Sequence, residues 1–194
     1  MSGDHELLAG VAGRDPEAFR TLMERYSAGV INLASRFLGV RADAEEVAQD
    51  LFFRLYQRPP VLEPTGKLFT WIYRVTVNLC LDRLRRRSRE AGTFSLEAPL
   101  PGEIDGEKSF LDERLSDSSA TGPRERVIQA EQAAAARQAV AALPEVLRAP
   151  LILSTFEDLS HEQIAKILKI SPKAVERRLS RARSLLKSRL APYL

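Results

Sequence analysis

Two amphipathic segments separated by a very short break place the strongest constraint on how this 194-residue chain folds. Ser160 with Gln163 three residues later has the form of a capping box, and apolar residues recur at helical spacing up to Leu168. Ser171 followed by Pro172 marks a second helix start, because proline at the first helical position costs no hydrogen bond. The spacing therefore predicts a helix-turn-helix.

The second of these segments combines an apolar face with a basic one. Apolar residues at steps of three and four, from Val175 to Leu186, predict the face that packs inward. The basic residues are Lys173, just before this run, and Arg177, Arg178, Arg181 and Arg183 within it. In a helix-turn-helix, such residues on the second helix reach into the major groove of DNA. The pattern favours DNA binding, and a solvated basic face is the simpler alternative.

Residues 1–90 predict a second all-helical module. Asp15-Pro16 predicts a helix start, and Gly39 predicts the end of that helix. A second helix is expected from Asp43, with apolar residues including Tyr56 facing inward, and it ends before Pro59-Pro60. The pattern from Lys67 to about Arg89 contains neither Pro nor Gly and predicts a third, longer helix.

This third helix has aromatic residues near its start and arginines at its end. Aromatic faces stack on unpaired bases while guanidinium groups follow phosphates, so the combination suits single-stranded DNA. Core packing is the alternative for Trp71 and Tyr73, and the one favoured for Trp71, because Ile72 and Leu79 lie on the same helix. Arginines at a helix C-terminus also complement the helix dipole.

The stretch between the two modules is acidic and contains many Pro, Gly and Ser residues. Such a composition buries little apolar surface and predicts a linker at residues 91–124. The fold class expected is all-α: two small helical domains, residues 1–90 and 125–194, joined by a flexible linker.

Composition excludes several other kinds of protein. Cys80 is the single cysteine, so no intrachain disulfide can form, and we expect it to be a small hydrophobic side chain. The two histidines are distant in sequence, with no Cys/His cluster for a metal ion, and no phosphate-binding loop or nucleophile-base pair is present. We expect no cofactor, no metal and no enzymatic activity. No apolar run predicts membrane insertion, and the expected location is the cytoplasm.

Three segments resemble regions of bacterial sigma factors. The run DAEEVAQDLFFRLYQ (43–57), followed by KLFTWIYRVTVNLCLDRLRRR (67–87), resembles the second region of that family, and residues 143–186 resemble the fourth region. Both occur in the family's order with only a short linker between them. The chain therefore most resembles the extracytoplasmic-function (ECF) group. The resemblance implies a subunit that directs core RNA polymerase to promoters and opens the minus-ten element.

The resemblance also implies roles for individual residues. The contacts with the beta-prime clamp helices of polymerase would be made by Asp43, Glu46, Gln49 and Asp50. The minus-ten element would be bound by Lys67, Trp71, Arg74, Asn78, Arg83, Arg85 and Arg86. The minus-thirty-five element would be bound by Ser171, Lys173, Ala174, Glu176, Arg177, Arg178 and Arg181. The beta flap of polymerase and an anti-sigma factor are further implied partners.

Glu176 and Pro150 are two unusual positions in the C-terminal module. Glu176 departs from the neutral or basic residue common in the family: it could accept a hydrogen bond from a cytosine amino group, pair with Lys173 or Arg177, or face solvent. Pro150 is expected to shorten or kink the helix at residues 147–156.

The alternative functions are a stand-alone helix-turn-helix regulator and, less favoured, a helical adaptor whose basic faces are only solvated.

Overall fold

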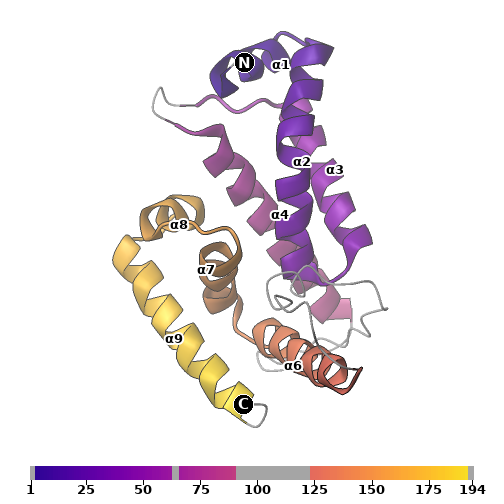
Figure 1. The fold of residues 1–194 in the computed structure, drawn as a ribbon. Coiled ribbons are helices and arrows are strands. Elements are labelled where there is room, and N and C mark those ends of the chain that lie inside the picture. The colour runs from indigo at the N-terminus through magenta and orange to yellow at the C-terminus, as the bar shows by residue number, and fades with distance from the viewer. Residues whose placement is uncertain (1–2, 63–65, 91–122, 192–194) are drawn as a thin grey trace. The chain divides into compact units, whose positions relative to one another are not determined.

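The computed structural model describes residues 3–62, 66–90 and 123–191, the last range with side chains from residue 131 onward. In these ranges every regular element is a helix, which confirms the predicted all-α class (Figure 1). The chain divides into two compact units, one mainly of residues up to Arg85 and the other mainly of residues from Arg86, and each is described by itself. The predicted linker lies almost wholly outside the described residues.

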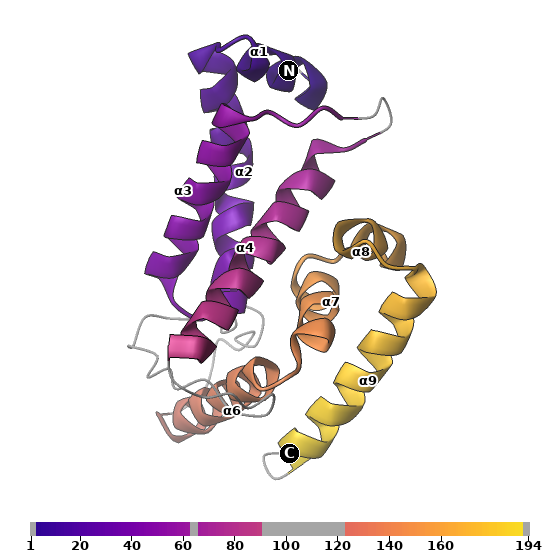
Figure 2. The same ribbon diagram turned by 180° about the vertical axis from the view of Figure 1, so that it is seen from behind.

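Four helices form the N-terminal unit. They are α1 (Asp4–Ala12), α2 (Pro16–Leu38), α3 (Arg41–Gln57) and α4 (Leu68–Glu90). Figures 1 and 2 show α3 lying along α2, with α1 across one end of α2 and α4 beside the pair. The core is formed by side chains that are completely or almost completely buried, among them Leu22, Leu33, Leu51, Leu55, Leu68 and Ile72.

The ends of α2 follow the predicted signals. The Asp15 carboxylate accepts a hydrogen bond from the Glu17 amide at 2.9 Å, and Pro16 occupies the first helical position. Gly39 has a positive φ of 74°, the left-handed conformation that glycine adopts at no cost, and it ends the helix. By contrast, α3 starts at Arg41, two residues before the predicted Asp43, and its N-cap residue Val40 makes no side-chain hydrogen bond.

Helix α1 was not predicted. It buries Leu7, Leu8 and Val11 against the rest of the unit. A Cβ at Gly10 would lie only 2.6 Å from the Ala18 Cβ, so glycine permits the close approach of α1 to the start of α2. Its apolar residues occupy little more than two turns, which is too short for periodicity to identify a helix.

A polar cluster attaches the start of α1 to α2. The two carboxylate oxygens of Asp4 accept hydrogen bonds from Arg25 and from the Tyr26 hydroxyl, each at 2.5 Å. Partial burial, together with the bond to Asp4, raises the pKa of Tyr26. The hydroxyl therefore keeps the proton that it donates.

The described residues of the C-terminal unit also form four helices. They are α6 (Pro123–Ala141), α7 (Glu145–Phe156), α8 (His161–Leu168) and α9 (Pro172–Leu190). Helix α9 packs against α6 and α7. The core side chains include Leu143, Ile152, Leu153, Ile164, Ile167, Val175 and Leu179. Helix α6 was not predicted as a helix, and it begins at Pro123, two residues before the predicted start of the C-terminal domain.

Pro150 lies inside α7 and does not shorten it, so that part of the prediction is wrong. The helix begins before Leu147, at Glu145, and reaches the predicted end at Phe156. Proline removes the hydrogen bond to the carbonyl of residue i−4, which here is Val146. Since Val146 is 56% exposed, water can replace the missing donor.

A buried arginine joins α6 to α7. One terminal nitrogen of Arg148 donates to the carbonyl oxygens of Ala141, at 2.5 Å, and Leu143, at 2.9 Å. The Ala141 carbonyl is the last of α6, where carbonyls lack intrahelical donors and carry partial negative charge, so the guanidinium group supplies both a hydrogen bond and an opposite charge. Leu143 lies in the connection between the two helices. Burial lowers the pKa of Arg148, but an arginine keeps its charge in proteins.

Cys80 is completely buried in α4, as expected for a small hydrophobic side chain, and burial raises the pKa of its thiol to about 12.

We expect a thiol reagent at pH 8 to modify Cys80 only as fast as the chain unfolds, because the reagent needs an accessible thiolate. The unfolded chain loses this proton near its ordinary pKa of 9.0. Stability should therefore fall as the pH rises from about 9 towards 12. A Cys80→Ala variant, compared by denaturant unfolding at pH 8 and pH 10.5, should lack this part of the fall.

No helix in the described ranges is both long enough and apolar enough to cross a membrane.

Candidate nucleic-acid interface

Helix α3 has one buried side and one polar side. The buried side consists of Ala44, Val47, Ala48, Leu51, Phe52 and Leu55. On the opposite side, at steps of three and four residues, the exposed residues are Glu46, Gln49, Asp50, Phe53 and Gln57, which we call the acidic face of α3. Three of the four predicted polymerase contacts share this face. The fourth, Asp43, is half-buried near the start of the helix.

Phe53 is a member of this face that the sequence pattern did not identify. Its side chain is 61% exposed, the largest exposure of any aromatic residue among the exposed large hydrophobic residues of the described ranges. An exposed aromatic ring surrounded by polar side chains is typical of an interface hot spot. The signal was present in the spacing, because Phe53 follows Asp50 by three residues and Gln49 by four.

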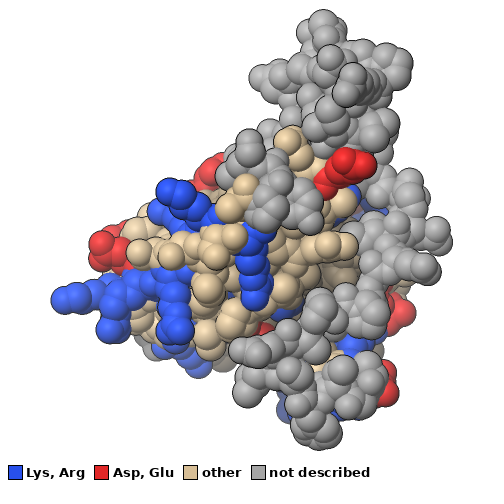
Figure 3. All heavy atoms as spheres, turned by 90° about the horizontal axis from the view of Figure 1, so that it is seen from below, with Lys and Arg blue, Asp and Glu red and all other residues tan. Residues whose placement is uncertain are grey.

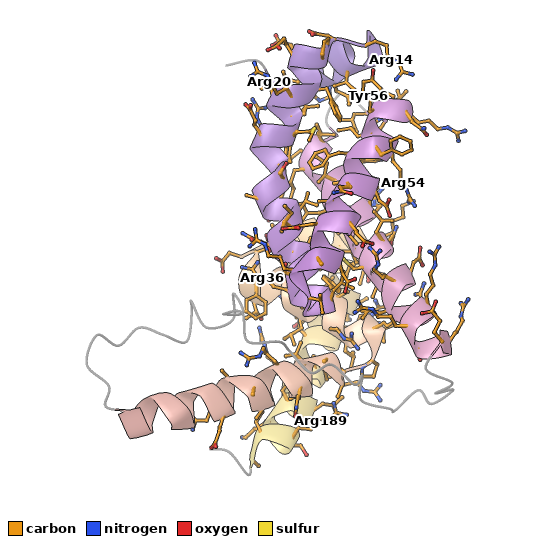
Figure 4. The ribbon with its side chains drawn as sticks, turned by 90° about the vertical axis from the view of Figure 1, so that its right-hand side faces the viewer. Arg14, Arg20, Arg36, Arg54, Tyr56 and Arg189 are labelled. Carbon is orange, nitrogen blue, oxygen red and sulfur yellow. The ribbon has the colours of Figure 1, made fainter. Side chains whose placement is uncertain are left out.

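Tyr56 was predicted to face inward, and its side chain is instead 37% exposed. Its ring centroid lies 5.1 Å from that of Phe19 and 4.8 Å from the guanidinium carbon of Arg14 (Figure 4). The ring therefore lies at the edge of the unit, in contact with the turn between α1 and α2. A cation over an aromatic ring is an attractive contact.

Most of the predicted minus-ten residues form one stripe along α4. Steps of three and four residues connect Lys67, just before the helix, with Trp71, Arg74 and Asn78, and a step of seven residues leads on to Arg85. We call these five residues the α4 stripe. Lys67, Asn78 and Arg85 are exposed, and Trp71 and Arg74 are half-buried. The other side of the helix carries its buried residues, among them Ile72, Tyr73, Thr76, Val77 and Cys80.

Arg83 does not join this stripe. It donates one hydrogen bond to the Asp43 carbonyl oxygen at 3.3 Å and a second to the Glu46 carboxylate, so its guanidinium group is directed at α3. Only 27% of its side chain is exposed. Arg86 is exposed, at the edge of the stripe. The prediction had grouped these arginines by their closeness in sequence, whereas the helix distributes them over different faces.

The aromatic residues of α4 divide between core and surface. Tyr73 is buried, with its ring centroid 4.1 Å from that of Phe69, so the core interpretation holds for it. Its hydroxyl oxygen would lie 3.2 Å from a Cβ at Gly29, which shows how closely it approaches α2. Trp71 remains half-buried and keeps part of its ring on the surface.

The two C-terminal helices begin at the predicted caps. Ser160 and Gln163 form the reciprocal capping box: the Ser160 amide donates to Gln163 at 2.8 Å, and the Gln163 amide donates to the Ser160 hydroxyl at 3.3 Å. The Ser171 hydroxyl accepts from the Ala174 amide at 3.2 Å, and Pro172 is the first residue of α9. Between the helices, Lys169 adopts the left-handed conformation with a φ of 54°.

Helix α9 presents the predicted minus-thirty-five residues on the side away from its buried residues, Val175, Leu179 and Ala182. Ser171, Lys173, Glu176, Arg177 and Arg181 are exposed, while Ala174 and Arg178 are half-buried. We call these seven residues the basic face of α9. Figure 3 shows Lys and Arg side chains gathered at the left edge of the view, the side on which α9 lies in Figure 1.

Glu176 is the one acidic residue of this face. Within the part of the chain that the structure describes, its carboxylate forms no hydrogen bond or ion pair, although Lys173 and Arg177 lie on the same helix. The pairing alternatives considered for Glu176 are therefore not realised. Its acceptor oxygens face solvent.

Two family models match the chain. Sigma-70 region 2 matches residues 22–90, which include the acidic face of α3 and the α4 stripe. Sigma-70, region 4 matches residues 133–186, which include the helix-turn-helix. The two matches lie in the two units described above.

Comparison with individual proteins agrees. The chain is 30% identical over 191 residues to the RNA polymerase sigma-H factor of Pseudomonas aeruginosa, covering 98% of this chain and 95% of that protein. It is 28% identical to the ECF RNA polymerase sigma factor SigW of Bacillus subtilis, covering 91% and 90%. In fold it is similar to the sigma factor RpoE of Bartonella quintana, solved with the anti-sigma factor NepR, with a TM-score of 0.60, 19% identity and coverage of 89% and 96%.

Three observations indicate the same family. The helices α3, α4 and α9 carry the expected faces, the two family regions occur in their usual order, and the relatives have nearly the same length as this chain. The chain belongs to the sigma-70 family of RNA polymerase sigma factors, and within it to the ECF group.

Proposed function

We propose that this sigma factor divides its work among three surfaces: the acidic face of α3 binds core RNA polymerase, the α4 stripe binds the minus-ten element, and the basic face of α9 binds the minus-thirty-five element. The observation that carries the proposal is that each predicted set of residues, Asp43 and Arg83 excepted, lies on one side of one helix. A helix side of this kind can engage a single partner without rearrangement of the core.

The acidic face of α3 suits a basic partner with an apolar contact at its centre. Glu46 and Asp50 supply negative charge, and Phe53 supplies apolar area that becomes buried on binding. We assign this face to the beta-prime clamp helices of polymerase. The beta flap is assigned to the C-terminal unit on the family resemblance alone.

The α4 stripe suits unpaired DNA. Arg74 and Arg85 supply positive charge for phosphates, Asn78 supplies both donors and acceptors for a base, and the exposed part of Trp71 supplies a stacking surface. Moving a base out of the duplex costs a few kcal/mol, and contacts made only with the open strand offset that cost. Opening of the promoter then needs binding energy and no catalytic group.

Helix α9 suits duplex DNA. Its N-terminal half follows the turn at Lys169, as in recognition helices, and carries Lys173, Arg177 and Arg178, residue types that contact bases and phosphates in a major groove. A regulator consisting of this module alone would not need the acidic face of α3 or the α4 stripe. For that reason the sigma factor function is favoured over a stand-alone regulator.

An anti-sigma factor is the remaining proposed partner. The Bartonella quintana sigma factor of similar fold was solved with an anti-sigma factor, NepR. We propose that a protein of this class covers the polymerase-binding or DNA-binding faces of this chain, and that the chain acts in the cytoplasm, where polymerase and promoters are found.

The direct test is in vitro transcription with purified core polymerase and a library of genomic promoter fragments. We expect the chain to initiate from a small subset of fragments that share two elements. Core polymerase alone provides the control. Absence of promoter-specific initiation would contradict the proposed function.

A second test concerns base reading by Glu176. A carboxylate accepts hydrogen bonds only, so it selects the amino group of cytosine, and it also repels phosphates. Glu176→Gln should reduce discrimination at one base pair of the minus-thirty-five element by about 1–3 kcal/mol while raising affinity for unrelated duplexes. Binding should be measured by anisotropy on a set of single-base variants. A uniform rise in affinity across all duplexes would instead show that Glu176 makes no base contact.

A further inference from the structure

Two side chains of the N-terminal segment, those of His5 and Arg14, contact backbone carbonyl groups in the residues that flank the connection between α3 and α4. His5 Nε2 lies 3.1 Å from the carbonyl oxygen of Gly66, two residues before α4 begins. Arg14 donates a hydrogen bond to the carbonyl oxygen of Tyr56 at 2.9 Å, one residue before α3 ends. These contacts span 61 and 42 residues of sequence. One short segment, α1 with the turn after it, therefore reaches both ends of the connection.

The direction of the first contact is fixed by chemistry. A carbonyl oxygen only accepts, so the Nε2 atom of His5 must carry the proton that it shares with Gly66. Both the neutral tautomer protonated at Nε2 and the imidazolium ion meet this requirement. The interaction therefore does not depend on the charge of the ring.

The segment that provides these contacts is itself firmly attached. Leu7, Leu8 and Val11 are buried, and the Asp4 carboxylate accepts hydrogen bonds from Arg25 and Tyr26 of α2. His5 follows Asp4 directly, so its backbone is fixed by that cluster. The end of a chain normally frays unless it is tied down in this way.

The second contact is equally well supported. Arg14 has a positive φ of 65°, uncommon for a residue other than glycine, and this conformation carries the chain from α1 into α2. Its guanidinium group also lies over the ring of Tyr56 (Figure 4). The end of α3 is therefore held through both backbone and side chain.

The residue after Gly66 is Lys67, the first member of the α4 stripe, and Trp71 follows one turn later. His5 thus acts on the backbone at the point where the proposed minus-ten surface begins. A surface whose shape is set before binding loses less conformational entropy when it binds.

We infer that α1 positions the start of the α4 stripe for minus-ten recognition, with His5 as the positioning residue and no contact of its own with DNA. This inference rests on the proposed function of the stripe. It gives a functional role to a helix that precedes the part of the chain matched by the region 2 model, residues 22–90.

The test compares His5→Ala, which removes the donor, with His5→Gln, which keeps an N–H donor at a similar reach. The full-length variants, with core polymerase, are assayed for open-complex formation on the library fragment from which the parent chain initiates best. One hydrogen bond is lost, so His5→Ala should slow opening about three- to tenfold, and His5→Gln should restore most of the rate. Affinity for core polymerase and for a minus-thirty-five duplex should not change.

A second readout needs no promoter. Trp71 is the only tryptophan in the chain, so fluorescence reports on the start of α4 directly. Acrylamide should quench Trp71 more strongly in His5→Ala than in the parent or His5→Gln. The matched control is Ala9→Ser, a change at an exposed position of the same helix that leaves His5 intact, and its quenching should equal that of the parent.

A double-mutant cycle separates positioning from a general effect. The loss caused by His5→Ala should be smaller in a Lys67→Ala background, because the positioned side chain is then missing, and should be unchanged in an Arg178→Ala background. Additive losses with Lys67→Ala would overturn the inference. So would equal losses in His5→Ala and His5→Gln, a parent-like rate of opening in His5→Ala, or a parallel fall in thermal stability and core affinity. If the parent itself fails to initiate from any fragment, the proposed function fails instead, and the Trp71 result still tests the position of α4.

Discussion

Asp50→Arg is expected to weaken the binding of this sigma factor to core RNA polymerase by about 2–4 kcal/mol, or about thirtyfold to a thousandfold in Kd. Asp50 lies near the middle of the acidic face of α3, between Glu46 and Phe53. A reversed charge there replaces attraction to a basic partner by repulsion, and like charges brought together at an interface cost several kcal/mol. Fluorescence titration of labelled chain with core polymerase measures the change.

Glu24→Arg is the matched control, because it makes the same change of charge on a different face. Glu24 lies on α2 with 68% of its side chain exposed. Its variant should bind core polymerase with an affinity close to that of the parent. Asp50→Arg should keep the parent's affinity for a minus-thirty-five duplex. An equal loss of core affinity in both variants would show that net charge matters and that the acidic face of α3 does not.

Arg148→Met is expected to lower the free energy of unfolding of the C-terminal unit by about 2–4 kcal/mol. Methionine approximates the length of the arginine chain but donates nothing, so the carbonyl oxygens of Ala141 and Leu143 lose their partner. Buried acceptors without a partner keep the full cost of desolvation. Thermal unfolding followed by circular dichroism should show an earlier loss of helix.

Trp71 locates this loss within the molecule. Because the only tryptophan lies in the N-terminal unit, its fluorescence transition should change little while the dichroism transition moves to lower temperature. Arg183→Met, at an exposed position of α9, provides the control and should leave both transitions within a degree or two of the parent's. Equal shifts for the two variants would show that Arg148 does not hold α6 and α7 together.

Local signals in the sequence predicted the helices whose ends are capped by side chains. Asp15, Ser160 with Gln163, and Ser171 all cap the helices expected of them, because capping depends on residues within one turn. Helices without such signals were missed. Helix α1 is short, and α6 is rich in alanine, whose small side chain gives little contrast between a buried and an exposed face.

The candidate site was predictable to the extent that it lies on single helices. Spacing placed Glu46, Gln49 and Asp50 together on the outer side of their helix. Lys67, Trp71 and Asn78 were named from the family resemblance, and they also fall on one side of a single helix. The orientation of the Arg83 side chain could not be predicted from spacing. Its direction is set by Asp43 and Glu46 on another helix, 40 and 37 residues away in sequence, and no local pattern contains that information. The contacts of His5 and Arg14 are long-range in the same sense.

The capped start of α9 has a consequence for how promoter preference can change. Ser171 and Pro172 fix where the helix begins, and its buried residues are Val175, Leu179 and Ala182. The exposed positions Lys173, Glu176 and Arg177 therefore contribute little to the stability of the unit. Under the proposed function, substitutions at Lys173, Glu176 or Arg177 would alter which minus-thirty-five sequence is bound while the core of the unit stays intact. On this proposal, one substitution on the basic face of α9 would be enough to change promoter preference, whether it arises by natural divergence or by design.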